Sequence, residues 1–499
     1  MGDPGEGKVK GKHGQMGAGE AALCAVLCIL LSQGCVETKR YTYERVKTHY
    51  RAAETGWDAP KPVAGPLLQA PKGALTLDKA VRIALQGNPD VDMALARIRQ
   101  AHGAIDEAGA AFWPTLSLYG EYLQGDAPSA YLFKTIDQRM LPPGVNFNDP
   151  GWFENYEVGL HARVNLFRGG RDLLRRRMAE TGLHIHELDR QSIENALVES
   201  VIHAYFQALA GRDYVKIAEQ SLATVEEQKR VLEVRYRAGG ALRSDLLSLE
   251  VRVAQAKEEL VRARNNHAMS LVALAILLSF DPDTPLHLEE GQEISPPFPE
   301  DYASGLAQAL ANRPELKKAR HQVVRSYMAL DMARSEYFPT LDAHARYYMD
   351  HPDARFSTSR DNWVAGIILN WDVFTGLSTR VKADQARGAL EEIFARDRKA
   401  TQAVQLDVKS AYLGLAEARA RIDVTRAAVA QAEESLSLVK KEYEGGSAAI
   451  TRYLEAELAL NRARIRARTA YYDKEKALAS IGRGIGYWSS YAERVRYGE

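Results

Sequence analysis

Residues Tyr156–Phe167 read YEVGLHARVNLF, and two kinds of side chain alternate along them. The apolar positions are Tyr156, Val158, Leu160, Ala162, Val164 and Leu166. The positions between them are polar or small, namely Glu157, Gly159, His161, Arg163 and Asn165. Alternation with a period of two is typical of a β-strand that has one apolar and one polar face. The rest of the chain reads mainly as long helices, so this strand needs an explanation.

The strand belongs to one half of an internal duplication. Residues 87–119 and 312–344 align at a single offset, which pairs Pro89 with Pro314 and repeats the tripeptide Pro-Thr-Leu at 114–116 and 339–341. Further on, Gly159 pairs with Gly366 and Phe167 with Phe374 at a smaller offset, because the first copy has a longer loop between residues 125 and 155. A repeat of about 200 residues is far longer than a solenoid unit, so the chain is a duplicated half-molecule.

Each half is predicted to contain the same elements in the same order. A helix is followed by a strand after Pro114 or Pro339, then a loop, a second strand and two long helices. The last strand is expected to place Trp363, Ala365, Ile367, Leu369, Trp371 and Val373 on one face. The fold class is therefore mainly α with a small transmembrane β part.

The long helices carry a seven-residue hydrophobic repeat. Between Leu197 and Tyr236, and again between Leu246 and Leu274, apolar or small residues recur at alternating spacings of four and three. A heptad repeat over this many turns predicts coiled-coil packing with a left-handed supercoil. A helix from Gly170 to Gly239 would be roughly 100 Å long, which is longer than a globular domain needs.

Strands of this length with one apolar face fit a transmembrane β-barrel. Every backbone group in lipid must be paired, so the sheet must close, and about eight strands is the practical minimum. Four strands per chain therefore predict that several copies share one barrel. The alternatives are a small sheet packed on a soluble helical domain, a periplasmic coiled-coil adaptor or rod without a pore, and, more distantly, an enzyme.

The chain resembles the TolC-like outer-membrane efflux and secretion channels over about residues 75–486. The resemblance lies in the duplicated NPD and RPE helix starts, the FWPTL and YFPTL strand starts, and the turns LFRGG and VFTGL. The helix tips RYRAGGALRSDLL and KEYEGGSAAITRYL add to it. It implies a homotrimer with a twelve-stranded barrel in the outer membrane and a helical tunnel in the periplasm. It also implies that the tunnel docks on a periplasmic adaptor and an inner-membrane pump, and that the polar strand residues face the lumen, namely Glu157, His161, Arg163 and Asn165.

The resemblance also suggests which residues form the periplasmic end of the tunnel. Helix reversals are expected at the glycine pairs of the two tips, which would dock the adaptor: Gly239, Gly240, Gly445 and Gly446. The gate positions of the family correspond here to Ser244, Asp245, Tyr443, Arg452 and Glu455. Arg452 departs from the family pattern, because it replaces one of two constricting carboxylates. Ala448 stands where a gate arginine is usual, so Arg452 or Arg243 becomes the alternative partner of Asp245.

The N-terminus predicts export. Three lysines precede the apolar run Ala21–Leu31, which is too short to span a membrane and typical of a signal peptide. The run ends in LLSQGC, which resembles a lipobox with lipidation at Cys35, although Ser32 and Gln33 fit that pattern poorly. Ordinary signal-peptidase cleavage nearby is the alternative. All three cysteines lie within the first 35 residues, so the body of the chain has no disulfide framework.

The remaining features exclude several functions. The formal net charge is zero, which argues against a nucleic-acid partner. No catalytic residue, cofactor or metal site is predicted; His184 and His186 point to different sides of a helix, and GRGIG at 482–486 is a helix stop. The expected segments are a signal peptide (1–35), an N-terminal extension (36–74), the first repeat (75–280), a linker (281–300), the second repeat (301–486) and a C-terminal tail (487–499). The exported substrate is not readable from the sequence.

Overall fold

The computed structural model describes residues 73–497, apart from 142, 292, 295–297 and 357. Cys35 and the predicted signal peptide lie outside the described residues. The chain divides into two compact units, which we treat separately. The sheet unit contains Glu107–Leu173 and Ser335–Thr379. The helical unit contains Leu174–Arg334, Arg380–Glu499 and the described part of Pro62–Asp106.

The sheet unit has four antiparallel strands in the order β1-β2-β3-β4. The strands are β1 (Thr115–Gly125), β2 (Phe153–Arg168), β3 (Thr340–His351) and β4 (Asp361–Asn370). The predicted strands are confirmed, and β1 and β3 both begin directly after the proline of their repeat. The last strand is shorter than expected, because β4 ends at Asn370, and Trp371 instead donates its indole N–H to the carbonyl of Tyr337 at 3.1 Å.

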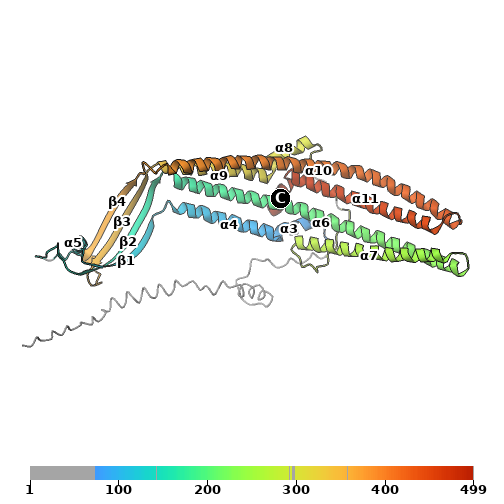
Figure 1. Ribbon diagram of the computed structural model, residues 1–499, viewed down its shortest axis with the longest axis horizontal. Coiled ribbons are helices and arrows are strands. Elements are labelled where there is room, and N and C mark those ends of the chain that lie inside the picture. The colour runs from blue at the N-terminus through green and yellow to red at the C-terminus, as the bar shows by residue number, and fades with distance from the viewer. Residues whose placement is uncertain (1–72, 142, 292, 295–297, 357, 498–499) are drawn as a thin grey trace, which may run out of the picture. The chain divides into compact units, whose positions relative to one another are not determined.

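The first strand connection also forms a short helix, α5 (Pro128–Asp137), which the sequence analysis did not identify. Pro128 occupies the first turn, where the missing N–H of proline costs nothing. Figure 1 shows α5 beside the loop ends of the four strands. In the second half, the described part of the connection between β3 and β4 contains only a single 3₁₀ turn, η3 (Thr358–Arg360).

The helical unit contains the predicted long hairpins (Figure 1). The first pairs α6 (Arg171–Arg237) with α7 (Arg243–Leu277), and the second pairs α10 (Ser378–Glu444) with α11 (Ile450–Gly484). Helices α6 and α10 each have 67 residues, and α7 and α11 each have 35, so the duplication is preserved in length. The shorter helices are α3 (Leu77–Gly87), α4 (Pro89–Ala110), α8 (Tyr302–Asn312), α9 (Pro314–Arg334) and α12 (Tyr487–Tyr497).

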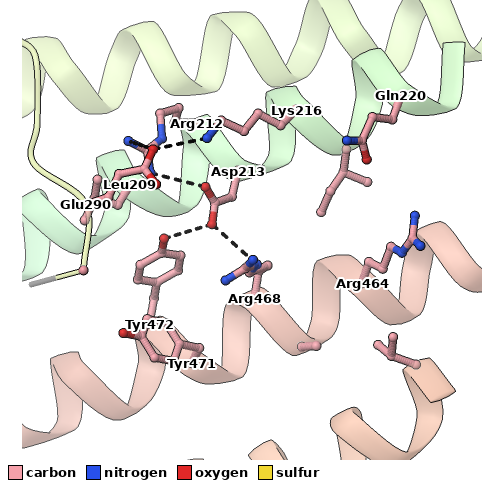
Figure 2. A pocket seen from close by; sticks show the side chains of 14 residues that line it. Leu209, Arg212, Asp213, Lys216, Gln220, Glu290, Arg464, Arg468, Tyr471 and Tyr472 are labelled. Carbon is pink, nitrogen blue, oxygen red and sulfur yellow. Dashed lines mark hydrogen bonds and ion pairs between the residues drawn. The ribbon is translucent and has the colours of Figure 1, made fainter. Parts of the chain in front are cut away.

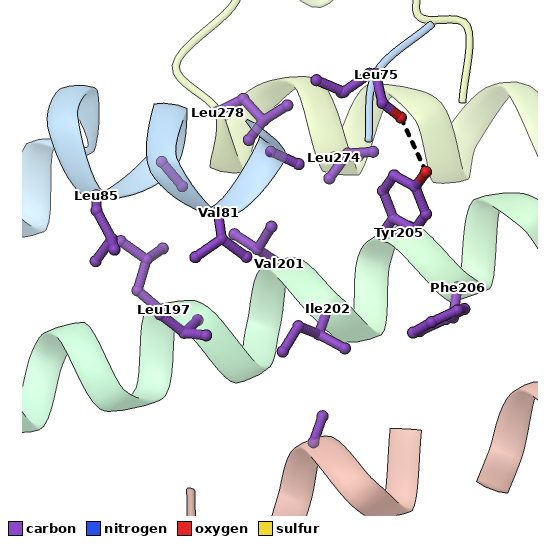
Figure 3. Packing of buried hydrophobic residues seen from close by; sticks show 14 of the residues in the cluster. Leu75, Val81, Leu85, Leu197, Val201, Ile202, Tyr205, Phe206, Leu274 and Leu278 are labelled. Atoms are coloured by element: carbon purple, nitrogen blue, oxygen red, sulfur yellow. Dashed lines mark hydrogen bonds between the residues drawn. The ribbon is translucent and has the colours of Figure 1, made fainter. Parts of the chain in front are cut away.

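The main core of the helical unit brings distant parts of the chain together. Figure 3 shows Leu197, Val201, Tyr205 and other buried residues of α6 facing Val81 and Leu85 of α3 and Leu274 of α7. The hydroxyl of Tyr205 lies 2.9 Å from the carbonyl oxygens of both Leu75 and Glu289. Because a buried hydroxyl needs a partner, these contacts tie the start of the first repeat and the linker that follows it to α6.

Two segments outside the predicted repeats also belong to this core. The expected linker contributes Leu286, Ile294 and Phe298, which pack against the cluster. The expected C-terminal tail contains α12, whose Trp488 and Ala492 are buried in the cluster. Helix α11 ends at Gly484, and Gly486 follows with φ +78, so the GRGIG segment is a helix stop as predicted.

Candidate functional site

The register of the sheet separates its two faces. Leu160 of β2 lies opposite Leu118 of β1 and Tyr347 of β3, and these three side chains share the apolar face. On β4 the same face shows Trp363 and Ile367, with exposed fractions of 78% and 66%. Glu157, His161, Arg163 and Asn165 share the other face with Asp342, His344, Arg346 and Asp350. The predicted alternation is therefore clear in β2 and β3, whereas β4 also carries the apolar residues Val364 and Ile368 on the polar face, opposite Arg346 and Asp342.

Glu157 lies in a charged network under α5 rather than open to solvent. Its side chain contacts the ammonium of Lys134 of α5, the hydroxyl of Tyr119, and the guanidinium of Arg346, which lies 2.5 Å away. Lys134 also donates to Asp350 at 3.0 Å, so one cation bridges two carboxylates. Glu157 is only 3% exposed, which corrects the expectation that it faces water.

Two further contacts hold α5 on this face. Gln138 donates to the side-chain oxygen of Asn155 at 2.8 Å, and Asn155 donates to Asp350 at 2.6 Å. The hydroxyl of Tyr348 donates to Asp137 at 3.1 Å. Sequence analysis missed Lys134 and Asp350. Lys134 lies 23 positions from Glu157 and 216 positions from Asp350 along the chain, so no local pattern connects these residues. The signal that could have pointed to α5 was the proline at the start of a helical segment in the long first loop.

Close packing on the polar face requires Gly159. A Cβ atom there would lie 2.7 Å from the carbonyl oxygen of Tyr347 and 2.8 Å from Cβ of Tyr348. It would also lie 3.0 Å from the hydroxyl of Tyr119, which takes part in the Glu157 network. Such distances are below ordinary van der Waals contact, so any larger residue would push the network apart.

The other predicted residues of this face lie farther from α5. Arg163 forms an ion pair with Asp342 at 3.4 Å, and Asn165 donates to the same carboxylate at 3.1 Å. A β-bulge follows between Asn165 and Phe167. His161 is half-buried and lies opposite Arg346. This end of the polar face is therefore wetter than the end beneath α5.

The helix tips are closed by Schellman motifs. Gly239 and Gly446 have φ values of +77 and +79, the left-handed conformation that favours glycine. The N–H of Gly240 donates to the carbonyl of Arg235 at 2.9 Å, and the N–H of Ser447 donates to that of Glu442 at 2.8 Å. These bonds satisfy carbonyls at the end of each helix. Gly239 and Gly446 therefore reverse the chain, whereas Gly240 and Gly445 do not have positive φ.

The two tips pack against each other through a small hydrophobic cluster. It joins all four long helices of the helical unit, with buried side chains Val225, Leu232, Leu249, Val253, Val439, Ile450 and Tyr453. The ring of Tyr443 stacks on that of Tyr453 with centroids 5.8 Å apart, and the guanidinium of Arg235 lies 5.7 Å from the Tyr443 centroid. Burial raises the pKa of Tyr443 above its ordinary value.

The remaining gate candidates lie around this cluster. Ser244 and Asp245 occupy the first turn of α7, and Glu455 is exposed on α11. Arg452 forms an ion pair with Glu442 at 3.1 Å, across the turn between α10 and α11. Arg452 thus has a carboxylate partner within its own hairpin, and the pairing of Asp245 with Arg452 or Arg243 stays a prediction.

A polar cavity of about 570 Å³ lies between α6 and α11 (Figure 2). Asp213 accepts a hydrogen bond from Tyr472 at 2.9 Å and pairs with Arg468 at 3.6 Å, while Glu290 pairs with Arg212 at 2.9 Å and with Lys216 at 3.2 Å. Burial and the neighbouring Asp213 raise the pKa of Tyr472. Three cations, Arg212, Lys216 and Arg468, thus share two carboxylates, and the cluster is a polar cross-link that holds residue 290 and α11 on α6.

The described part of the chain lacks two features. None of the helices in that part of the chain combines the length and apolarity needed to cross a bilayer. Within the same residues, no group of three or more His, Cys, Asp or Glu side chains is placed to hold a metal ion.

A family model described as "outer membrane efflux protein" matches residues 80–279 and 305–486. These two segments correspond to the two halves of the duplication. Among curated proteins, the pyoverdine export outer membrane protein OpmQ of Pseudomonas aeruginosa is 26% identical over 392 residues, covering 78% of this chain and 80% of OpmQ. Protein CyaE of Bordetella pertussis is 23% identical over 387 residues, covering 77% of this chain and 78% of CyaE.

Solved structures agree with the fold. The Campylobacter jejuni CmeC outer membrane channel superposes with a TM-score of 0.73 at 16% identity, covering 82% of this chain and 85% of CmeC. The Vibrio cholerae outer membrane protein VceC gives a TM-score of 0.70 at 19% identity, covering 82% of this chain and 96% of VceC. The fold is thus that of the outer-membrane channels, and the alternative of an adaptor or rod without a pore is not favoured.

Proposed function

Because the chain belongs to the outer membrane efflux protein family, and so is an outer-membrane channel component of efflux or secretion systems, we propose that three copies form one channel. In this trimer the four-stranded sheets join edge to edge into a twelve-stranded barrel. The observation that carries the proposal is the sheet itself, whose outermost strands are β1 and β4 and whose two faces differ in polarity. An open sheet cannot persist in lipid, where unpaired backbone groups cost several kcal/mol each.

Closure of the barrel also determines what each face of the sheet contacts. The apolar face with Leu160, Trp363 and Ile367 contacts the acyl chains, and aromatic residues such as Trp363 suit the membrane boundary. The polar face with His161, Arg163 and Asn165 lines the lumen. Outer-membrane lipid is therefore a partner of the chain. Lipidation of Cys35 would add a second anchor on the periplasmic side.

The long hairpins would continue the channel into the periplasm. Their tips are stiff, since each is closed by a Schellman motif and both share one hydrophobic cluster. We assign docking of a periplasmic adaptor, and through it an inner-membrane pump, to the tips around Gly239, Gly240, Gly445 and Gly446. The chain itself would be a passive duct for an efflux or type I secretion system.

We also assign gating of the duct to the same tips. Tyr443 is held by Tyr453 and Arg235, and Asp245 lies near enough to Tyr443 to raise its pKa further. We assign Ser244, Asp245, Tyr443, Arg452 and Glu455 to the constriction. Exposed charge pairs contribute only about 1 kcal/mol or less, so a gate built from them can open and close readily.

The test is the assembly and conductance of the extracted protein. Protein purified from the outer-membrane fraction in mild detergent should have the mass of a trimer and should carry a small ion current in a planar bilayer. The current should rise when Asp245→Ala and Tyr443→Phe are combined. A monomeric species would contradict the shared barrel, whereas a trimer whose current ignores both changes would contradict only the gate assignment.

Glycine at the left-handed positions allows a sharper test of the tips. Gly239→Val should reduce the export that a gene deletion abolishes while leaving the amount of trimer nearly unchanged. A Cβ atom in this conformation costs about 1–2 kcal/mol, and branching makes it worse. The strain should reshape the tip that meets the adaptor, and trimer yield and export are the two measurements.

Gly240→Val is the matched control, because Gly240 lacks the positive φ and an added Cβ would only touch the carbonyl oxygen of Arg235 at 3.6 Å. It should retain most export. If Gly239→Val lowers trimer yield and export in parallel, the glycine is only a helix cap and the docking assignment is wrong.

A further inference from the structure

Helix α5 has two unlike sides. One side carries Lys134 and Gln138, which bond to the buried polar residues of β2 and β3. The opposite side carries Phe133 and Ile136, whose exposed fractions are 66% and 48%. Met140 and Leu141 follow the helix and are also exposed. We call Phe133, Ile136, Met140 and Leu141 the apolar stripe.

The position of the stripe is unusual for the face it occupies. α5 lies on the polar face of the sheet, so its far side points away from the wall and toward the interior of any barrel that the sheet closes. The interior of a barrel in this family is wet, and contiguous apolar side chains in water generally mark an interaction surface. A partner must therefore come from inside the barrel.

We propose that the three copies of α5 in one trimer meet around the barrel axis through their apolar stripes and close the outward mouth of the channel. This inference rests on the trimer described above. The occupant of each stripe is thus the α5 helix of the other copies. Each α5 would be fastened to its own wall by Lys134, which bridges Glu157 and Asp350.

The dimensions agree with such a plug. Twelve strands about 4.8 Å apart and tilted by about 40° enclose a circle roughly 24 Å across between backbones. A helix with its side chains is about 10–12 Å wide. Three helices of that width, each lying on the wall, leave no open bore between them. The first loop supplies one such helix per copy, whereas the described part of the second loop has only η3.

The polar contacts explain how the plug could be stable and still open. Lys134 with its two carboxylates, and Gln138 with Asn155, fix where each helix sits on its wall. The contacts between stripes are apolar and confined to a few side chains, so they separate without breaking those bonds. A passing substrate would then part the helices rather than unfold them. The channel would have one closure at the tips and another at the outward mouth.

Thiol cross-linking tests the contact in the full-length protein. The natural cysteines all lie at or before residue 35, so Ile136→Cys introduces the only thiol near the plug. A short thiol-specific cross-linker should convert much of the Ile136→Cys protein into covalent dimers. Asp353→Cys is the matched control, because Asp353 is exposed in the other loop. It should remain monomeric on a denaturing gel.

Failure of the plug and failure of the trimer give different experimental results. If native mass measurement shows an intact trimer but Ile136→Cys gives no more dimer than Asp353→Cys, the plug is wrong and the trimer stands. If no trimer forms for either variant or the unmodified protein, the proposed assembly itself fails. Abundant Ile136→Cys dimers in an intact trimer support the plug.

Conductance gives an independent readout that does not disturb folding. Phe133→Ser combined with Ile136→Ser removes exposed apolar groups and leaves the Lys134 contacts intact. In a background of Asp245→Ala and Tyr443→Phe, which removes the proposed closure at the tips, the open probability in a planar bilayer should rise about tenfold, equivalent to about 1.4 kcal/mol. An unchanged open probability would overturn the closure even if the helices are close together.

Discussion

Leu160→Arg should remove most of the protein from the outer-membrane fraction, because the new guanidinium would face lipid. Leu160 lies on the apolar face of β2 between Leu118 and Tyr347. An arginine on the lipid face of a barrel costs about 2–4 kcal/mol near the bilayer midplane, and a trimer carries the change three times. The measurement is the amount of heat-modifiable trimer in the membrane fraction, together with its denaturant midpoint in bilayers.

The neighbouring substitution His161→Arg introduces the same side chain on the opposite face. His161 lies opposite Arg346, so some repulsion is expected, but a partly exposed pair contributes only about 1 kcal/mol or less. His161→Arg should therefore leave most of the trimer in place. Equal losses from the two variants would mean that the faces of the sheet are assigned wrongly, and with them the barrel.

The expected difference between Leu160→Arg and His161→Arg depends on patterns that the sequence already contains. The alternation in β2 and the heptads in α6 and α7 are local patterns, since each follows from the period of the backbone that carries it. The duplication supported both, because each strand and hairpin was observed twice. The glycine reversals at Gly239 and Gly446 were also predictable, because a left-handed turn has a strong residue preference.

The polar network under α5 could not be predicted in the same way. Glu157 lies on the polar face of the sheet, as its place in the alternation predicted, but its partners Lys134 and Arg346 lie 23 and 189 positions away. No periodicity links such positions, so their burial depends on the tertiary fold. The pair of Arg452 with Glu442 was missed for a similar reason, because it forms across a turn whose geometry the sequence did not specify.

The C-terminal helix α12 shows most clearly how tertiary contacts can override a prediction made from local sequence. Residues 487–499 looked like a tail because they follow the helix stop at Gly486 and show no heptad. In the structure α12 contacts two other helices at its surface. Gln191 of α6 donates to Glu493 at 2.7 Å, and Tyr491 donates to Asp78 of α3. These contacts place α12 against the main core of the helical unit.

Trp488→Ala should destabilise the helical unit by about 3–5 kcal/mol, the usual cost of deleting a buried aromatic side chain. Trp488 is buried, packs edge-on against Phe298 and Tyr491, and donates its indole N–H to the carbonyl of Ala479 at 2.7 Å. A Cβ atom at Gly482 would lie 2.5 Å from this ring, so the indole occupies space that only glycine leaves free. Thermal unfolding followed by circular dichroism would measure the loss.

Trp488→Phe separates packing from the hydrogen bond. Phenylalanine keeps most of the ring contacts with Phe298 and Tyr491 but removes the hydrogen bond from the indole to the carbonyl of Ala479, a net loss of about 0.5–1.5 kcal/mol because that carbonyl lies inside α11 and keeps its helical partner. This variant should therefore unfold between the wild type and Trp488→Ala. If α12 were a dispensable tail, neither substitution would shift the transition, and removal of residues 487–499 would leave it unchanged as well. If Trp488→Ala alone shifts the unfolding transition by the full expected amount, α12 is part of the cooperative core. The eleven residues of α12 then stabilise the same cluster as α3, which lies some 400 residues earlier in the chain.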